Sequence, residues 1–408
     1  MNFLPFEKVI HIGVAWAKYM SASILVLGAS AAAAALLVWR YRARRRTLVG
    51  LSVVVRHGAR APNKHEMKVF TSTSPVREQW HHGDGRPADY EVENNLTDVG
   101  RAQMRAIGQW LAAHAQYGQL LRTLQLEWHS SSAERCVESG ALVGSGIVAC
   151  GTAAAPLRWP HKPITYDPDF VFRAWALKGT AYRKFVDALP DTEPFKRRAR
   201  RSYAQLWAAM EKLGGVRASE TDVLMWSTYV HLMSECEAYS DPLQPGGRKT
   251  ALHTALDQSA RRNLEEEACW VWERRFQGCT EHAQFLGEAL WQLLGAPCTR
   301  VRLFSGHDYT ILALMAYLGL RRYELPAVGY GAMLLVEHRA DGSARMLLNA
   351  QPFRDATSAA VTESVCANER VLAEKGVDGT ITLAAGLATS SALPCGAWTH
   401  RNRRASEA

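Results

Sequence analysis

The sequence predicts an α/β protein with a central, mostly parallel sheet flanked by helices and a mainly helical domain inserted into it. Two strand-like apolar runs, Leu51–Val55 and Arg300–Phe304, each lead into a glycine turn that carries charged side chains. A helix-like apolar run, Ile311–Leu320, follows the second turn. For the two turns to share one site, the long stretch of chain between them must both complete the sheet and fold outward as an insertion.

Before the first strand, residues 1–46 are predicted to form a membrane anchor with a basic flank. Tyr19–Trp39 contains no charged residue and has roughly the 20 residues that a helix needs to span the hydrocarbon core. The basic cluster Arg40–Arg46 follows it directly. A cleaved signal peptide with Ala29–Ala31 as its cleavage site is an alternative, but apolar sequence continues beyond that site. The polar residues before Leu48 disfavour a third interpretation, a buried core helix.

The first part of the α/β core, residues 47–156, carries the most informative motif of the chain. Arg56-His57-Gly58-Ala59-Arg60-Ala61-Pro62 begins where the Leu51–Val55 strand ends. A guanidinium supplies fixed donors that pair with phosphate oxygens, and an imidazole in the same place can attack phosphorus or accept a proton. The alternative is a basic surface turn with a solvated histidine. The number of specified positions at fixed spacing after a strand favours the phosphate-binding interpretation.

Two further segments of this part are predicted to support the motif. Leu96–Gln103 has the pattern of a helix start, with Thr97 as its N-cap, and it leads into an apolar stripe formed by Met104, Ile107, Trp110 and Leu111. Leu126–Arg135 has the pattern of a second strand followed by a serine-rich turn that presents Arg135. An exposed arginine in the first turns of a helix is the alternative interpretation of Arg135.

Residues 157–262 are predicted to be the inserted helical cap. The segment is rich in tryptophan, has several prolines near its start and contains the basic run Lys196–Arg201. Because the formal net charge of the chain is +9, some attraction to phosphorylated or anionic molecules is expected. The basic run is interpreted as a solvated helix face, since no aromatic-spaced RNA module or DNA-reading motif accompanies it. Specific nucleic-acid binding is therefore not predicted.

The second part of the core, residues 263–355, is predicted to complete the sheet. Glu265–Trp291 has apolar positions at helical spacing, as expected of a helix that supports the core, and Ser305-Gly306-His307-Asp308 follows the second strand. Two apolar runs, Gly329–Glu337 and Ala344–Ala350, are separated by a turn that contains Asp341-Gly342. This pattern predicts a hairpin, which is expected at the edge of the sheet.

Residues 356–408 are predicted to be a C-terminal extension with only weak periodicity. The extension is rich in Ala, Ser and Thr and ends in a charged tail, and Cys366 and Cys395 are candidates to staple it. The chain has eight cysteines in all, an even number that is compatible with disulfides but no denser than in ordinary cytosolic proteins.

Both motifs resemble those of a known family. Arg56–Pro62 matches the RHGxRxP signature of the histidine acid phosphatases, the second branch of the histidine phosphatase superfamily, and Ser305–Asp308 matches the family's second motif. The resemblance covers about residues 48–355, strongly at both ends and weakly between Leu157 and Arg262. It implies a phosphoglycerate mutase-like core with a mostly helical cap over the cleft. Pro62 and the Asp that follows His307 favour a phosphatase over a mutase.

The chemistry that these residues support is a double displacement. The resemblance implies that His57 attacks phosphorus to form a phosphohistidine, and that Asp308 protonates the leaving alkoxide, helped by the negative charge of the bound phosphate. The phosphate oxygens would be held by Arg56, Arg60, Arg135 and His307. The sequence contains no HExxH, no paired CxxC and no Asp-rich loop, so neither a metal nor another cofactor is predicted.

The resulting functional prediction is a membrane-anchored acid phosphatase that hydrolyses phosphate monoesters. A lysophosphatidic acid phosphatase is kept as a specific alternative, because Cys136 directly after Arg135 and the anchor both resemble that subfamily. Phytases share both motifs, but an anchored enzyme is poorly placed for a free soluble polyanion. A member of the fold that binds or scaffolds without turnover is the non-enzymatic alternative, and the complete set of motif residues argues against it. The oligomeric state is not predicted.

Two arguments about localisation disagree. The basic cluster Arg40–Arg46 lies on the C-terminal flank of Tyr19–Trp39, so the positive-inside rule places the catalytic residues on the cytosolic face. Members of the resembled family act in a lumen of the lysosomal or Golgi type or outside the cell, and this favours the lumenal side. The sequon at Asn95 is weak evidence for glycosylation, because it overlaps the segment assigned to the scaffold.

Overall fold

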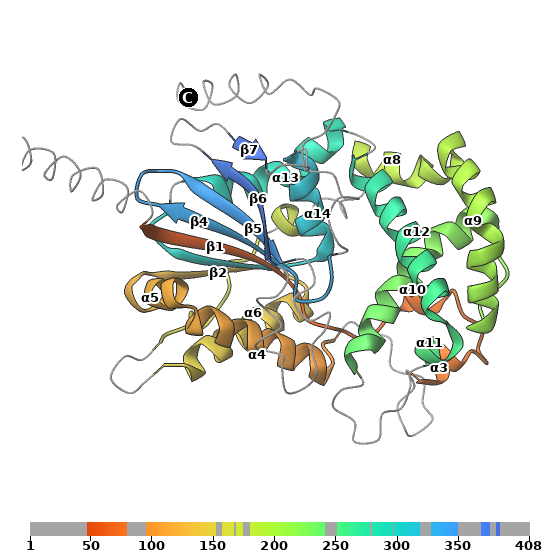
Figure 1. Cartoon of the computed structure of the whole chain (residues 1–408), viewed down its shortest axis with the longest axis horizontal. Helices are drawn as coiled ribbons and strands as arrows, with labels where there is room; N and C mark the ends of the chain where they lie inside the picture. The colour runs from red at the N-terminus through yellow and green to blue at the C-terminus, as the bar shows by residue number, and fades with distance from the viewer. Residues whose placement is uncertain are drawn as a thin grey trace, which may run out of the picture.

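The computed structural model describes residues 47–79, 95–151, 157–166, 169–173, 180–240, 251–277, 280–296, 298–318, 328–349, 369–375 and 381–383. Its centre is a seven-stranded sheet in the order β2-β3-β1-β4-β5-β6-β7 (Figure 1). The strands are β1 (Leu48–Arg56), β2 (Leu126–Ser130), β3 (Val301–Gly306), β4 (Met333–Arg339), β5 (Ala344–Asn349), β6 (Glu369–Lys375) and β7 (Ile381–Leu383).

The sheet is mixed, so the prediction of a mostly parallel sheet was wrong. Only β2, β3 and β1 run parallel to one another, and every neighbouring pair from β1 to β7 is antiparallel. Parallel neighbours need a crossover connection, and the helices that follow β1 and β2 supply connections of that length. A short turn joins β4 to β5, and a turn of that length allows only an antiparallel pair.

The predicted hairpin is confirmed, but its predicted place in the sheet was wrong. The β4–β5 turn has Gly342 at φ +82°, a left-handed conformation that glycine adopts without a steric penalty. β4 pairs with β1 in the middle of the sheet, and β5 pairs with β6. The first six residues of β4 are buried, which requires cover on both faces. β6 and β7 lie in the segment that was predicted as an irregular extension, and they continue the sheet beyond residue 355.

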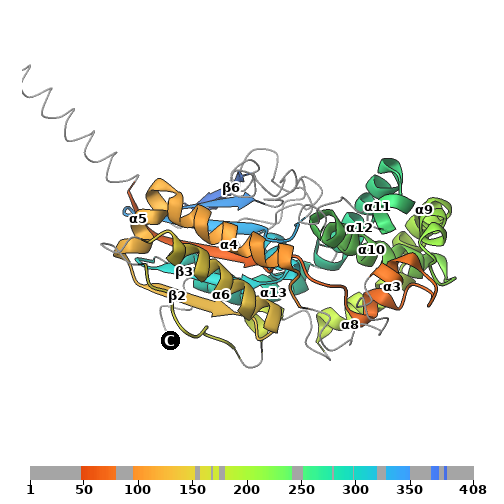
Figure 2. The ribbon, with the colours of Figure 1, turned by 90° about the horizontal axis from the view of Figure 1, so that it is seen from below.

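Helices cover both faces of the sheet because the strands alternate their side chains between two apolar cores. In β1, Val54 packs with one core, whereas Val53 and Val55 pack with the other. The Val54 core includes α13 (Thr280–Gly295) and α14 (Asp308–Tyr317). The opposite core includes α4 (Asp98–Ala113), α5 (Ala115–Thr123) and α6 (Glu134–Ala149), which lie in front of the sheet in Figure 2.

The predicted start of α4 is confirmed and holds the loop after β1 in place. The Thr97 side chain accepts a hydrogen bond from the backbone N–H of Gly100 at 3.1 Å, and the expected apolar stripe of this helix is buried. A Cβ on Gly100 would lie 2.0 Å from the Ala59 carbonyl oxygen, and one on Gly58 would lie 2.4 Å from the Gly100 carbonyl oxygen. The loop that carries the first motif therefore rests directly on the helix backbone, which only glycine permits.

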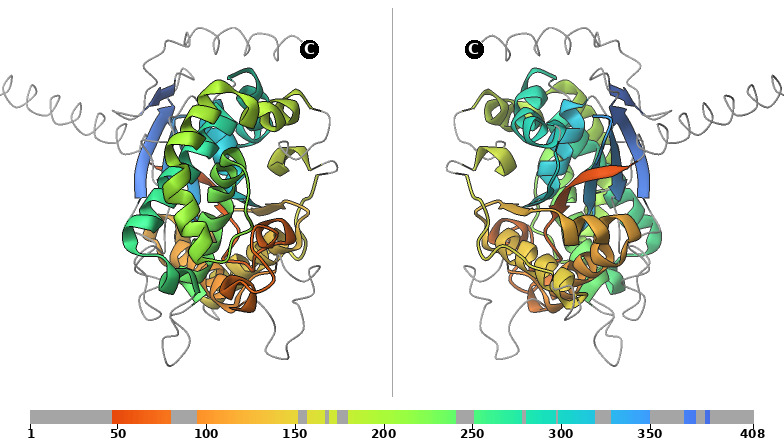
Figure 3. Two further views of the ribbon diagram at one scale, coloured as in Figure 1. Left: turned by 90° about the vertical axis from the view of Figure 1, so that its right-hand side faces the viewer. Right: turned by 90° about the vertical axis from the view of Figure 1, so that its left-hand side faces the viewer.

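A separate helical lobe lies beside the carboxyl ends of the parallel strands (Figure 1; Figure 3, left). It has its own apolar core, which includes residues of the segment after β1, such as Phe70 and Val76. The remaining helices are α2 (Lys64–Met67), α3 (Pro75–Gln79), α7 (Phe170–Arg173), α8 (Ala181–Ala188), the 3-10 helix Leu189–Asp191, α9 (Glu193–Lys212), α10 (Glu220–Ser240), α11 (Ala251–Ala255) and α12 (Gln258–Gln277).

The helical lobe and the predicted cap, 157–262, overlap without coinciding. Leu157 and Phe172 pack in the cores that cover the sheet. α12 continues past residue 262 and contributes to two cores. Val271 packs in the core of the helical lobe, and Trp272 packs in the Val54 core against the sheet. A continuous helix presents different faces to different neighbours, so no single residue along it divides the two parts.

The predicted anchor Tyr19–Trp39 and its flank Arg40–Arg46 lie outside the described residues, and so do Cys366 and Cys395. Across the described ranges, none of the helices has the length and apolar character that crossing a membrane requires.

Candidate active site

The predicted motifs meet at one edge of the sheet because β1, β2 and β3 are parallel and end together. The backbone ladder continues past the strand ends. The N–H of His57 donates to the Gly306 carbonyl at 3.0 Å, and the N–H of Ser131 donates to the Ser305 carbonyl at 3.0 Å. In folds with parallel strands, this carboxyl edge is where ligands commonly bind. The geometry therefore brings both motifs and the serine-rich turn into one site.

His57 is buried, and its ring is oriented by its own loop. Nδ1 lies 2.9 Å from the Gly58 carbonyl oxygen. Because a carbonyl only accepts hydrogen bonds, Nδ1 donates and Nε2 keeps its lone pair. Burial holds the pKa of His57 well below 6.5, and the charges of Arg135 and Arg56 lower it further. His57 is therefore a neutral imidazole with a free lone pair on Nε2, as a nucleophile needs.

Three contacts fix the guanidinium of Arg56. It donates to the Val328 carbonyl at 2.6 Å, lies 3.6 Å from an Asp308 carboxylate oxygen and stacks 3.9 Å above the centre of the Tyr330 ring. The Tyr330 ring also lies 5.7 Å from the His57 ring, centroid to centroid. Sequence reasoning did not find Tyr330, because it precedes β4 and no recognised motif contains it.

Arg60 is also buried, but it is held by a carboxylate that the sequence analysis did not identify. Its two terminal nitrogens donate to the two oxygens of Glu66, at 3.0 and 2.6 Å. Its positive charge still contributes to the low pKa of His57. Glu66 therefore fixes the plane of this guanidinium and offsets part of its charge. A carboxylate six residues after an arginine gives no recognisable sequence signal.

Arg135 and His307 contact each other across the site. The Arg135 guanidinium donates to Nδ1 of His307 at 3.2 Å, so Arg135 is partly buried against the site and does not extend into solvent. Burial and the positive charges of Arg135 and Arg173 hold the pKa of His307 well below 6.5. The His307 ring stands edge-on to the His57 ring, with centroids 5.6 Å apart. The site thus contains two neutral imidazoles among several guanidiniums.

Asp308 lies at the first position of α14, where a helix N-terminus favours an acidic side chain. Its carboxylate accepts a hydrogen bond from the N–H of Tyr309 at 2.8 Å, and it is 7% exposed. The preceding backbone is fixed by Thr310, whose hydroxyl oxygen accepts from the N–H of His307 at 3.0 Å. Asp308 therefore sits beside Arg56 at the start of a helix.

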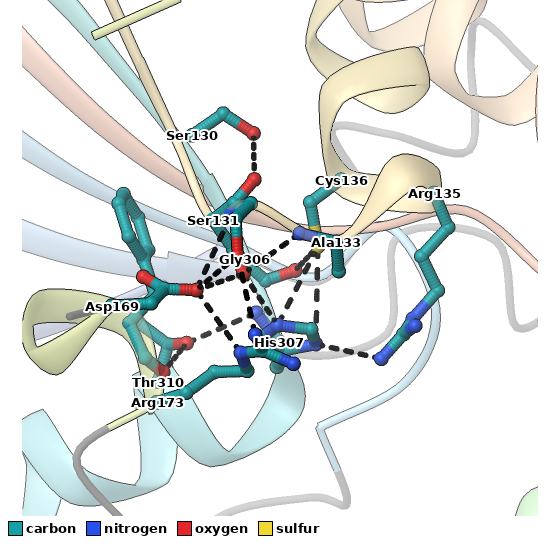
Figure 4. Close-up of polar contacts among 12 residues, drawn as sticks. Ser130, Ser131, Ala133, Arg135, Cys136, Asp169, Arg173, Gly306, His307 and Thr310 are labelled. Carbon is teal, nitrogen blue, oxygen red and sulfur yellow. Dashed lines mark hydrogen bonds and ion pairs between the residues drawn. The ribbon is translucent and has the colours of Figure 1, made fainter. Parts of the chain in front are cut away.

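Sequence reasoning missed three hydrogen-bonded residues, Ser131, Asp169 and Arg173, that lie on the Nε2 side of His307 (Figure 4). Ser131 lies between Nε2 of His307 and the Asp169 carboxylate, and Arg173 pairs with that carboxylate. Ser131 stood in the predicted serine-rich turn without an assigned role. Asp169 and Arg173 belong to the segment predicted as cap, and their spacing of four residues on a short helix is too common to indicate a site.

Cys136 is buried against the His307 ring and the backbone of Gly306. Its thiol donates to the Gly306 carbonyl at 3.3 Å and lies 3.7 Å from Nε2 of His307. Burial raises the pKa of this thiol to about 12, so it stays protonated and unreactive. Within the part of the chain that the structure describes, no group of three or more His, Cys, Asp or Glu side chains is arranged to hold a metal ion.

The sequence matches no protein-family model and no curated protein sequence. Solved structures do match. The tartrate complex of Hafnia alvei phytase has a TM-score of 0.55 at 13% identity, over 88% of this chain and 96% of that one. The complex of the same phytase with myo-inositol hexakis sulphate has a TM-score of 0.54 at 14% identity, over 78% and 86%. For Klebsiella sp. ASR1 phytase the TM-score is 0.52 at 14% identity, over 74% and 82%.

The chain has the fold of these phytases. These phytases are members of the histidine acid phosphatase family, so the resemblance drawn from the two motifs is confirmed at the level of the fold. At such low identity the likeness concerns the fold alone. The role of each site residue therefore depends on the geometry of this chain.

Proposed function

We propose that the chain is a phosphomonoesterase that transfers the phosphoryl group of its substrate to His57 and then to water. The observation that carries the proposal is the state of His57. Its Nδ1 is held by the Gly58 carbonyl, its Nε2 keeps a lone pair, and burial and the neighbouring guanidiniums hold its pKa well below 6.5, which favours the neutral ring. A buried neutral imidazole among guanidiniums suits attack on phosphorus better than binding of a cation.

In the first step, Nε2 of His57 forms a bond to phosphorus while the bond from phosphorus to the ester oxygen breaks. The charges of Arg56 and Arg135 both act on His57, and their guanidiniums would hold the nonbridging oxygens as charge redistributes. Asp308 would give its proton to the departing alkoxide, so the alcohol leaves neutral.

In the second step, water attacks phosphorus on the side that the alcohol has left. Asp308, now ionised, would take a proton from this water, and the bond from phosphorus to His57 breaks. The products are inorganic phosphate, a neutral His57 and a protonated Asp308, so the cycle is balanced without a cofactor.

For the substrate, the fold favours one candidate that the sequence argument disfavoured. The similar Hafnia alvei phytase was solved with myo-inositol hexakis sulphate, and inositol polyphosphates therefore enter as a second candidate class beside simple phosphate monoesters. Lysophosphatidic acid remains the candidate that the proposed anchor Tyr19–Trp39 favours, because a membrane-held enzyme meets lipid substrates at the bilayer.

The test is a substrate panel with the purified full chain at acidic pH. It compares p-nitrophenyl phosphate, phytate and lysophosphatidic acid, with His57→Ala as the matched inactive variant. Release of phosphate from p-nitrophenyl phosphate by the wild type alone supports the proposal, and the ratio of kcat/KM values assigns the substrate class. Binding of inorganic phosphate without release of phosphate from any ester would instead favour the non-enzymatic alternative, a binding protein.

A further inference from the structure

The site contains a chain of hydrogen bonds behind His307 that the proposed mechanism does not use. The hydroxyl oxygen of Ser131 lies 2.6 Å from Oδ2 of Asp169 and 3.0 Å from Nε2 of His307 (Figure 4). An ionised carboxylate only accepts hydrogen bonds, so the hydroxyl proton of Ser131 points to Asp169. Ser131 must then accept from His307, which places a proton on Nε2.

The opposite side of the His307 ring leads to the same assignment independently. Arg135 contacts Nδ1 at 3.2 Å, and a guanidinium can only donate. Nδ1 therefore carries the lone pair and faces the side of the site where Arg135 lies. Two unrelated contacts thus select one tautomer and one ring orientation.

The carboxylate of Asp169 is bound on the side that faces Ser131. Asp169 is 9% exposed and precedes α7, and the hydrogen bonds that the described residues give its carboxylate end on Oδ2. These come from Ser131, from the backbone and hydroxyl of Ser132 at 3.2 and 3.4 Å, and from Arg173 at 3.0 Å. Burying a carboxylate costs free energy unless the group is paired. The position of Asp169 behind the His307 ring therefore suggests that it acts on that ring.

The surroundings of His307 are otherwise strongly positive. The groups that face it are Arg135 and Cys136 from α6, Arg56, His57 and Arg60 from the end of β1 and its loop, Arg173 and Asp169 from α7 and the turn before it, and Asp308 from α14. Asp308 lies beside Arg56. Asp169 is the carboxylate connected to the His307 ring itself, through Ser131.

We propose that Asp169 is a positioning residue that acts through Ser131. It holds Nδ1 of His307 toward the phosphate site and supplies the opposite charge when a bound dianion draws a proton onto that nitrogen. A phosphate oxygen accepts hydrogen bonds, so Nδ1 must gain a proton to bind it. The proton comes from solution, and the new imidazolium is balanced by the dianion on one side and by Asp169 on the other.

This inference rests on the proposed phosphate site, and it has a readout that does not need turnover. Sulfate is a dianion throughout the working pH range, so any proton taken up when it binds goes to the protein. Calorimetric titration with sulfate in buffers of different ionisation enthalpy counts those protons. For the wild type we expect uptake near one proton per sulfate at pH 7, and His57→Ala should retain it because the proton goes to His307.

Two variants test separately the charge of Asp169 and its hydrogen bond to Ser131. Asp169→Asn keeps an acceptor for Ser131 but loses the charge, and Ser131→Ala breaks the connection while leaving Asp169 paired with Arg173. Each should lower the proton uptake and weaken sulfate binding by at least about tenfold, the equivalent of one pKa unit. The double variant should lose little more than either single one, because both act through one chain.

Two controls exclude a merely structural role. Arg173→Gln removes the ion pair to Asp169 but keeps Ser131, and Asp187→Asn removes a matched exposed ion pair with Arg183 on α8. Asp187→Asn should leave the proton uptake of the wild type intact. Arg173→Gln should not lower the uptake, because it removes a positive charge that holds the pKa of His307 down. Should Asp169→Asn fail to fold, Ser131→Ala carries the test.

The inference is overturned if proton uptake is unchanged in both Asp169→Asn and Ser131→Ala, or if their losses add in the double variant. An equal loss of uptake in Arg173→Gln also overturns it. A wild type that takes up the proton but hydrolyses no ester overturns the proposed function and leaves this inference standing.

Discussion

The rings of His57 and His307 stand edge to face at 5.6 Å, and both are neutral because burial and the surrounding guanidiniums lower their pKa values. Their roles differ because their nitrogens are held differently. His57 donates through Nδ1 to a backbone carbonyl of its own loop, whereas His307 presents Nδ1 to Arg135 and Nε2 to Ser131. One ring is therefore set to attack, and the other is set to bind.

The first prediction concerns the nucleophile. Enzyme quenched in denaturant during turnover should carry phosphate that is labile in acid and stable in base, as expected of phosphohistidine. His57→Ala should carry none and lose activity by several orders of magnitude. The exposed His65 provides the matched control, since His65→Ala should behave as the wild type. Label that survives hot acid would show attachment to a hydroxyl group and contradict the assignment.

The second prediction distinguishes the general acid, Asp308, from the phosphate-binding residue Arg135. Asp308→Asn should still turn over p-nitrophenyl phosphate, whose leaving group needs little protonation, while its activity on alkyl phosphates is lost. Arg135→Ala should weaken the inhibition by inorganic phosphate together with turnover on both substrates. Steady-state kinetics on the two ester classes measure this. Equal losses on both esters in Asp308→Asn would assign that residue another role.

The third prediction follows from the contact between the motif loop and α4. A methyl group on Gly100 would lie 2.0 Å from the Ala59 carbonyl oxygen, so the loop that carries His57 must shift. Gly100→Ala should cost about 1–3 kcal/mol of stability, as overpacking does, and it should reduce kcat. Denaturant unfolding and kinetics check both effects. Ala113→Ser, at an exposed position of the same helix, should change neither.

The fourth prediction concerns pH. The folded pKa of His57 lies well below 6.5 because of burial and the neighbouring arginines. If His57 is the nucleophile, the acid-side midpoint of the kcat/KM profile should therefore lie below the pH of about 6.5 expected for a free imidazole. Between that folded pKa and about 6.5 the unfolded chain binds more protons, so stability should fall as the pH drops through this window. His57→Gln and His307→Gln should each flatten the fall of Tm with decreasing pH. A fall of the same steepness in both variants would contradict the burial of neutral imidazoles.

The fifth prediction concerns the anchor, which stays a prediction. The uncharged run Tyr19–Trp39 should keep the full chain in membranes washed with carbonate, and deletion of residues 1–46 should release it. Protease added to sealed vesicles then determines the orientation. Protection of the catalytic residues supports a lumenal position, and rapid digestion means that Arg40–Arg46 has placed them in the cytosol.

The sequence by itself determined the parts of the site that are local. The strand that ends at Arg56, the turn at His57 and the helix that begins at Asp308 are each specified within a few residues, because strand ends, glycine turns and helix starts depend on neighbours in the chain. The N-cap at Thr97 was predictable for the same reason. Parallel strands that end together then place these motifs at one edge.

The tertiary structure alone decided which residues hold those motif side chains in place. Tyr330 under Arg56, Glu66 on Arg60 and Asp169 behind His307 come from segments whose spacing carries no signal. The antiparallel pairing of β4 with β1 was likewise unpredictable, because the apolar pattern of β4 is that of any buried strand and does not indicate which strand lies beside it. Contacts between residues far apart in the chain depend on the packing of whole elements, and local sequence patterns do not encode that packing.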